Sequence, residues 1–271
     1  MSSPAGPTPP PPSPMYSAPV PPTAPEPLGP GLSEGQRLTN VFFAPTKTFE
    51  DLKRNPSWWV PFIISAVFGL MVGIVTVQKV DMRQFAQQQI DKSPLAQRQL
   101  ERLTPEQREQ NLSIRAAITK GTFYAIPVFQ LIGGLIFAAI LMAIFNFILG
   151  AEVSFGRALG VVFYAGIPAI IRSVLLIISL LSSSDPSTID LSGNPMPTNP
   201  GFFLDPQGNK LLYSLASALD IFTIWYVVLL GLGFAAASMN RKPSKGTGMA
   251  TVFVCYGIVV LIGLGFKLAF S

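Results

Sequence analysis

The sequence predicts an all-α integral membrane protein: a polytopic bundle of five transmembrane helices, with interfacial helices and a disordered, proline-rich N-terminal tail. Five apolar runs are separated by polar stretches, and charged residues make up only 12% of the 271 residues, against 49% apolar. A bilayer core about 30 Å thick needs about 20 apolar residues in a helix. Because water is absent at that depth, the backbone must satisfy its own hydrogen bonds. The predicted spans are residues 58–77, 122–149, 158–181, 211–238 and 249–266.

Residues 1–36 form the predicted tail, followed by a membrane domain over residues 37–271. Thirteen of the first thirty residues are proline. Such a segment cannot bury an apolar core, so we expect it to be extended and disordered. A docking segment for SH3-like or WW-like modules and a flexible spacer are both compatible with this composition, and the spacer is the simpler interpretation.

Residues 37–57 are expected to approach the membrane surface. Thr46 is a candidate cap for a short helix that carries Phe49 and Leu52 on one side. With basic residues on the other side, this helix would lie in the headgroup plane. A plain juxtamembrane linker is the alternative.

Small residues in the first two spans are expected to let helices approach closely. Packing within the chain is the expected use, and self-association is the alternative. Pro127 is expected to kink the second span. The small residues are Ser65, Gly69 and Gly73 in the first span and Gly133 and Gly134 in the second.

The longest polar connection, residues 78–121, contains two helix-start signals. Ser93-Pro94 is the first, and Thr104-Pro105-Glu106-Gln107 is the stronger, since it combines a cap, a first-turn proline and a capping-box glutamine. We predict a helix that begins within two residues of Pro105, as part of a helical hairpin over the membrane surface. A solvated loop is the alternative. Residues 182–210, rich in proline, are expected to form an irregular exposed loop.

Four polar residues within the spans are the candidate functional side chains: Gln130, Asn146, Arg172 and Asp220. Polar and ionisable residues inside a membrane are functional candidates by default. At 1.5 Å per residue, Arg172 and Asp220 lie roughly 13 Å below the same surface on consecutive helices. We therefore predict that they form an ion pair. The alternative has Arg172 reaching a polar cavity or backbone carbonyls, and Asp220 nearer the interface because the fourth helix begins later.

Composition argues against several classes of function. Histidine is absent, and the single cysteine, Cys255, lies inside an apolar run, so no disulfide and no Cys–His metal site is expected. Nucleotide-binding and hydrolase motifs are missing. The scattered basic residues predict no nucleic-acid partner. We expect a non-enzymatic protein without cofactor or metal, whose partners are membrane lipids and possibly other membrane proteins.

Charge at the predicted helix ends favours a cytoplasmic N-terminus and an external C-terminus. Residues 182–210 then face outward with three acids and one base, in accord with the positive-inside rule. Residues 78–121 oppose this assignment, with eight basic and five acidic residues on the outer side. We give more weight to the short inner flanks, whose basic residues are Arg37, Lys47, Lys53, Arg54, Arg157, Arg241, Lys242 and Lys245.

Three stretches together resemble the Yip (Ypt-interacting protein) family in its bacterial form. They are FFAPTKTFEDLKRNPSWWVPF at 42–62, GRALGVVFYAGIPAIIRSVL at 156–175 and RKPSKGTGMATVFV at 241–254. The resemblance covers residues 37–270 and implies a polytopic protein of the bacterial cytoplasmic membrane. Eukaryotic members look like adaptors for small GTPases and shapers of secretory membranes. An Asp-Leu-Tyr-Gly-Pro-type segment is missing before the first span, so GTPase binding is doubtful.

The predicted function is therefore a non-enzymatic membrane scaffold or membrane organiser. The alternative is a transporter or channel component with a polar path near Arg172 and Asp220, lined also by Gln130 and Asn146. The odd number of spans and the lack of an evident inverted repeat favour the scaffold. A tunnel that reaches Arg172 would favour the transporter.

Overall fold

The computed structural model describes residues 30–269 apart from 192, 207 and 241. Residues 32–271 form one compact unit, and every regular element described in it is helical. The α-helices are α1 (Glu34–Phe43), α2 (Pro45–Asp51), α3 (Trp59–Lys79), α4 (Met82–Asp91), α5 (Pro94–Glu101), α6 (Pro105–Tyr124), α7 (Ile126–Leu149), α8 (Phe155–Ala165), α9 (Ala169–Ser182), α10 (Lys210–Ala218), α11 (Ile221–Ala237) and α12 (Lys245–Ala269). Two 3-10 helices, η1 (Pro186–Thr188) and η2 (Pro200–Phe203), lie between α9 and α10.

Most of the predicted tail lies outside the described residues, but its boundary was placed too late. Helix α1 begins at Glu34, inside the range 1–36 that was assigned to the tail. Ser33 caps it, since the Gln36 N–H donates to the Ser33 hydroxyl and the Ser33 N–H donates to the Gln36 side chain. This reciprocal pair is a capping box. The sequence carried the signal in Ser33-Glu34-Gly35-Gln36.

Four helical segments are long and apolar enough to cross a membrane: α3, α7, the α8–α9 segment and α12. A fifth crossing results if the bent pair α10–α11 is counted as one span. These segments coincide with the predicted spans to within a few residues at each end. The fold class is therefore confirmed as a bundle of four to five apolar helices.

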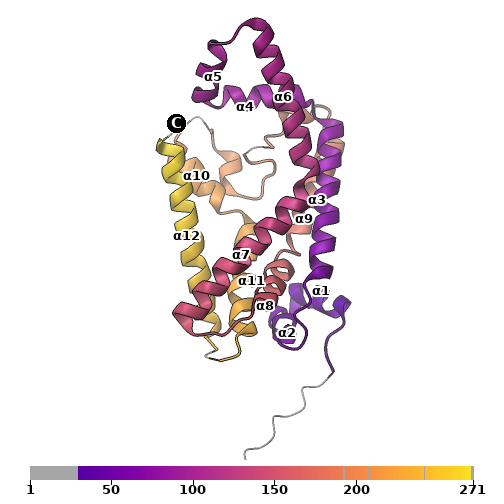
Figure 1. The fold of residues 1–271 in the computed structure, drawn as a ribbon, viewed down its shortest axis with the longest axis vertical. Coiled ribbons are helices and arrows are strands. Elements are labelled where there is room, and N and C mark those ends of the chain that lie inside the picture. Colours follow the sequence, from indigo (N-terminus) through magenta and orange to yellow (C-terminus); the bar gives the residue numbers. More distant parts are fainter. Residues whose placement is uncertain (1–29, 192, 207, 241, 270–271) are drawn as a thin grey trace, which may run out of the picture. The chain divides into compact units, whose positions relative to one another are not determined.

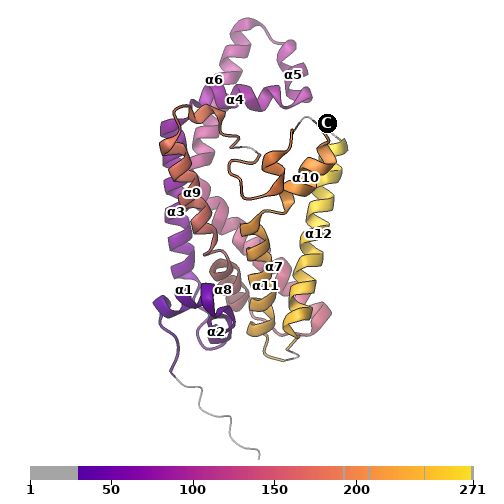
Figure 2. The ribbon, with the colours of Figure 1, turned by 180° about the vertical axis from the view of Figure 1, so that it is seen from behind.

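The connections gather at two ends of the bundle (Figures 1 and 2). We call one of them the N-terminal end; it contains α1, α2 and the turns at 150–154 and 238–244. The opposite end contains α4, α5, the start of α6, the loop at 183–209 and α10. Successive spans run in alternating directions, so the described end of α12 lies at the opposite end from α1.

The start of α6 confirms the prediction at Pro105. The Gln107 N–H donates to the Thr104 hydroxyl at 3.3 Å, and the Thr104 N–H donates to the Gln107 side chain at 3.0 Å. Helix α5 likewise begins at Pro94 behind a Ser93 cap. Pro127, however, does not kink a span. Helix α6 ends at Tyr124 and α7 begins at Ile126, so Pro127 lies in a first turn, where a missing N–H costs nothing.

The fourth predicted span is not a continuous helix. Helices α10 and α11 are bent by 52° at Leu219–Asp220. The Asp220 carboxylate accepts from the N–H groups of Phe222 at 3.1 Å and Thr223 at 3.0 Å, which makes it the N-cap of α11. The fourth apolar segment therefore begins at Lys210, close to the predicted start, and is broken at Asp220, which caps α11 and does not lie inside a continuous helix.

The loop at 183–209 is more ordered than an irregular exposed segment. It contains both 3-10 helices, and Met196 and Asn199 are buried within it. The Asn199 side chain donates to Asn194 at 3.0 Å, and Asn194 donates to Ser217 of α10 at 2.8 Å. The Asn199 side-chain oxygen also accepts from the Phe202 N–H at 3.1 Å, so a side-chain amide satisfies a backbone group of this loop.

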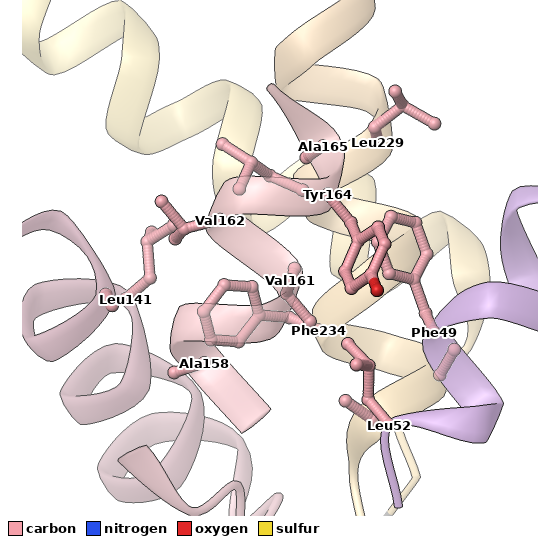
Figure 3. Packing of buried hydrophobic residues seen from close by; sticks show 14 of the residues in the cluster. Phe49, Leu52, Leu141, Ala158, Val161, Val162, Tyr164, Ala165, Leu229 and Phe234 are labelled. Atoms are coloured by element: carbon pink, nitrogen blue, oxygen red, sulfur yellow. The ribbon is translucent and has the colours of Figure 1, made fainter. Parts of the chain in front are cut away.

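Phe49 and Leu52 of α2 are core residues and not headgroup contacts. Both are fully buried and enter the cluster between α8 and α11 (Figure 3). Glycines on those helices make room, because an added Cβ on Gly160 would lie 2.9 Å from Leu52 and one on Gly233 would lie 3.2 Å from Phe49. Thr46 is not the cap, since α2 begins at Pro45 without a side-chain cap.

Close helix approach occurs at several of the small residues. A Cβ added to Gly73 of α3 would lie 2.2 Å from the Phe123 carbonyl oxygen of α6, and one added to Gly134 of α7 would lie 2.5 Å from the Phe163 ring of α8. A Cβ added to Gly69 would lie 2.8 Å from the Ile126 side chain. Gly133 differs, because an added Cβ there meets nothing within 4 Å.

We predict that Gly73→Ala destabilises the bundle by about 1–3 kcal/mol, since overpacking against backbone cannot be relieved by a side-chain rotation. Thermal unfolding of the purified protein in detergent measures this. Gly133→Ala is the matched control, and it should leave stability equal or raise it, because alanine favours the helix. Equal melting shifts in the two variants would contradict the close approach of α3 and α6.

Candidate functional site

The N-terminal end is built around a buried arginine. Arg37 of α1 is only 2% exposed. Its guanidinium contacts Asp51 at the end of α2, with Nε–Oδ2 and Nη2–Oδ2 distances of 2.8 and 2.7 Å. Nη1 reaches Glu34 at 3.3 Å, and Nη2 donates to the Asn55 carbonyl at 3.0 Å. One side chain therefore ties together α1, α2 and the segment that leads into α3.

This cluster extends to the transmembrane core through α8. The Tyr164 hydroxyl donates to the Glu34 carboxylate. Thr48 is also buried, and its hydroxyl donates to the Arg37 carbonyl at 2.8 Å. Burial works to lower the pKa of Arg37, but its polar partners, Tyr164 and Asp51 among them, raise it, so the guanidinium stays charged. We name Arg37, Asp51, Glu34 and Tyr164 the arginine clamp.

The clamp could not be found from the sequence. Arg37 was assigned to the basic flank of the first span, as one of several cytoplasmic charges. Its partner lies fourteen residues away with a helix boundary between them. The available signal was weak: two adjacent acids, Glu50 and Asp51, in an otherwise apolar and basic stretch of sequence.

Around the clamp lies a basic surface that we call the basic face: Lys53, Arg157 and Lys242. These residues come from the segment after α2, from α8 and from the turn before α12. Burial, followed by the positive charges of Lys242 and Arg157, lowers the pKa of Lys53, whereas Glu50 opposes that shift. The like charges are thus close enough to repel. Lys242 is partly compensated by Glu50 at 3.1 Å.

Asn146 serves the short turn between α7 and α8. Its side chain donates to the Val153 carbonyl at 2.9 Å and accepts from the Val153 N–H at 2.7 Å. Gly150 and Glu152 both have positive φ in this turn. Asn146 therefore holds a left-handed turn at the N-terminal end and does not line a path through the membrane.

A pocket of about 570 Å³ lies among α3, α7, α8, α9 and α11. Its walls are mostly apolar and aromatic, and its basic residue is Arg172. Gln130, Ser173 and Thr223 add polar groups, and no acidic side chain lines it. We name it the Arg172 pocket. It is lined by Ser65, Phe129, Gln130, Gly133, Gly134, Phe137, Val162, Phe163, Gly166, Ala169, Ile170, Arg172, Ser173, Phe222, Thr223 and Tyr226.

The predicted ion pair between Arg172 and Asp220 is not formed. None of the ion pairs found among the described residues joins them. Asp220 is occupied in capping α11 and in accepting from the hydroxyls of Thr198 and Thr223. The depth estimate failed because the helix begins at Asp220 and its carboxylate turns back onto its own first turn. Arg172 instead reaches a cavity, as in the alternative.

Two of the four polar candidates therefore meet in the Arg172 pocket. Arg172 and Gln130 both line it, and Asp220 lies behind it at the start of α11. Gln130 Oε1 is buried and accepts no hydrogen bond from the described part of the chain. Groups of three or more metal-binding side chains are not found among the residues described.

Comparison with known proteins gives one match. Residues 39–264 match the sequence model of the Yip1 domain. The match covers the helices from α1 to α12, the arginine clamp except Glu34 and Arg37, and the Arg172 pocket. No curated protein and no solved structure matches the chain.

We predict that Arg37→Ala destabilises the fold by about 3–5 kcal/mol, because it leaves the Asp51 carboxylate buried and unpaired. Thermal unfolding in detergent, with limited proteolysis between α1 and α3, measures the loss. Lys47→Ala on exposed α2 surface is the control. The double change Arg37→Met with Asp51→Leu should recover much of the stability, since apolar isosteres often replace a buried pair without loss. A shift no larger than that of Lys47→Ala would rule out the clamp as a structural constraint.

Proposed function

We propose, for a chain that belongs to the Yip1 domain family, a non-enzymatic role in organising the membrane in which it is embedded. The observation that carries this proposal is the basic face, in which three segments far apart in the sequence place Lys53, Arg157 and Lys242 together. The apolar helices anchor the protein in a bilayer. The basic face then lies where lipid headgroups are.

Electrostatics favours anionic lipids at this face. Each lysine or arginine near an anionic membrane surface contributes about 1 kcal/mol of attraction, which falls off within a Debye length. Burial lowers the pKa of Lys53, and the neighbouring charges of Lys242 and Arg157 lower it further. Anionic headgroups would relieve that repulsion. The arginine clamp fixes the segments that carry these charges, so the face is preorganised.

The same charges support a cytoplasmic N-terminal end. At the opposite end, basic residues are offset by acids, since Arg83 pairs with Glu109 at 2.6 Å and Lys92 with Asp190 at 2.8 Å. These pairs account for part of the basic excess of residues 78–121. The positive-inside rule concerns charge close to the spans, and the exposed excess lies at the N-terminal end. We place the protein in a cytoplasmic membrane with this end inside.

Transport is the second candidate, and two helix breaks favour it. The segment α8–α9 is interrupted around Pro168, and α10–α11 is bent at Asp220. The N-termini of α9 and α11 both line the Arg172 pocket. Broken helices with N-termini at a central site are typical of secondary transporters. Flux of small anions across vesicles that contain the protein would favour this function over the organising role.

We predict that the basic face enriches anionic lipid around the protein. The full-length protein is reconstituted in vesicles of phosphatidylglycerol and phosphatidylcholine, and the lipids retained on mild extraction are quantified. Changing Lys53, Arg157 and Lys242 together to glutamine should bring phosphatidylglycerol down toward its bulk fraction, as should high salt. The control changes Arg83, Lys92 and Arg98 at the opposite end. Equal losses in both triple variants, or none in either, would contradict the proposal.

Orientation is tested by labelling single cysteines in a Cys255→Ala background. Ser154→Cys lies in the α7–α8 turn at the N-terminal end, and Ser184→Cys lies after α9 at the opposite end; both residues are exposed. An impermeant thiol reagent applied to intact cells should label position 184 and leave position 154 unlabelled until the cells are opened. The reverse pattern would invert the orientation, and labelling of both positions would show that α8–α9 does not cross the membrane.

A further inference from the structure

We infer that the Arg172 pocket binds one anionic amphiphile, with its phosphate headgroup on Arg172 and its acyl chain along the apolar walls. The inference does not rest on the basic face, which lies at the N-terminal end and contacts headgroups from outside. The Arg172 pocket lies among the spans.

Arg172 needs a negative charge that the described chain does not give it. It makes no hydrogen bond or ion pair with a described residue. It lies ten residues before Ser182, the last residue of α9, which at 1.5 Å per residue is about 15 Å from that end. An isolated arginine at such depth is unfavourable in a bilayer. A bound anion removes much of that cost.

Asp220, the acid that the sequence predicted as the partner of Arg172, is already engaged. The Asp220 carboxylate accepts from two backbone N–H groups and from the hydroxyls of Thr198 and Thr223. Turning it toward Arg172 would uncap α11 in a low-dielectric environment. The lining of the pocket thus retains the positive charge of Arg172.

Gln130 does not add a second requirement for the headgroup. Its side-chain amide faces α3, because a Cβ added to Gly69 would lie 2.9 Å from its Nε2 and 3.1 Å from its Oε1. The Oε1 atom is buried there, so a ligand in the pocket does not reach it. The headgroup is therefore selected by Arg172, which requires a net negative charge. Phosphatidylglycerol has that charge, and phosphatidylcholine does not.

The remaining walls suit an acyl chain. Phe137, Phe163, Ile170 and Tyr226 line the pocket together with Phe129, which is 56% exposed on α7. Such exposure on an apolar helix places that wall toward lipid, so a lipid can enter from the bilayer. The volume of about 570 Å³ is within the range of small-molecule sites.

The test occludes the pocket without disturbing the fold. Gly133 lines the pocket, and an added Cβ there meets nothing within 4 Å, so Gly133→Leu fills the cavity. Gly257→Leu on α12 is the matched control, since that glycine is equally open. Native mass spectrometry of the detergent-solubilised protein measures binding of dioleoyl phosphatidylglycerol and of phosphatidylcholine with the same chains. The wild type should retain one phosphatidylglycerol, which Gly133→Leu loses and Gly257→Leu keeps.

The charge is tested separately. Arg172→Gln should weaken phosphatidylglycerol binding about ten- to hundredfold, and Arg172→Lys should recover part of it, because removing a charged hydrogen-bond partner has an effect of this size. Arg157→Gln on the basic face should not change the single tight site. Loss in Arg157→Gln but not in Arg172→Gln, or equal retention of the two lipids by the wild type, would overturn the inference. Displacement of the lipid by millimolar glycerol phosphate would show that the site binds a free anion. That result would overturn the inference that the ligand is an amphiphile.

Discussion

The buried contact between Arg37 and Asp51 is the constraint on which the N-terminal half of the bundle depends. It fixes α1 against α2, and through Glu34 and Tyr164 it fixes both to α8. Phe49 and Leu52 can enter the core only in that arrangement. Phe49 packs against Gly233 of α11 and Leu52 against Gly160 of α8, so α2 must lie close to both helices. A buried charge pair contributes less to stability than to a single defined geometry. Here the geometry it defines is the basic face.

The helix breaks are the second constraint, because backbone groups freed inside a membrane must find partners. At the α10–α11 bend, Asp220 accepts from the first N–H groups of α11, and the Tyr256 hydroxyl of α12 donates to the Ala218 carbonyl. The α8–α9 break is closed by turn hydrogen bonds around Pro168. With these groups satisfied, α10–α11 can bend and α8–α9 can be interrupted inside the bundle. The Arg172 pocket is lined by residues next to both breaks.

The spans and the helix starts could be predicted because they depend on residues close together in the sequence. The arginine clamp and the role of Asn146 could not, because they depend on contacts across turns and helix boundaries. Apolar length fixes α3, α7 and α12, and the capping box at Thr104 fixes α6 without reference to the rest of the fold. Asp220 carried a cap signal too, but an apolar run on both sides made the helix look continuous. Arg37 and Asn146 each find their partners across a turn or a helix boundary, so composition could identify them as polar but could not assign their roles.

Arg37 and Arg172 differ in what surrounds them. This difference supports a structural role for Arg37 and a binding role for Arg172. Arg37 is surrounded by two carboxylates, a carbonyl and a tyrosine, all supplied by the protein. Arg172 lines a pocket with aromatic walls, while Asp220, its predicted partner, caps a helix. If Arg172 served stability alone, an apolar residue would fill its place at lower cost. Arg172 has no protein partner and lies beside an open cavity, so binding of an anion there would stabilise it. The pocket and the charge therefore act as one binding site.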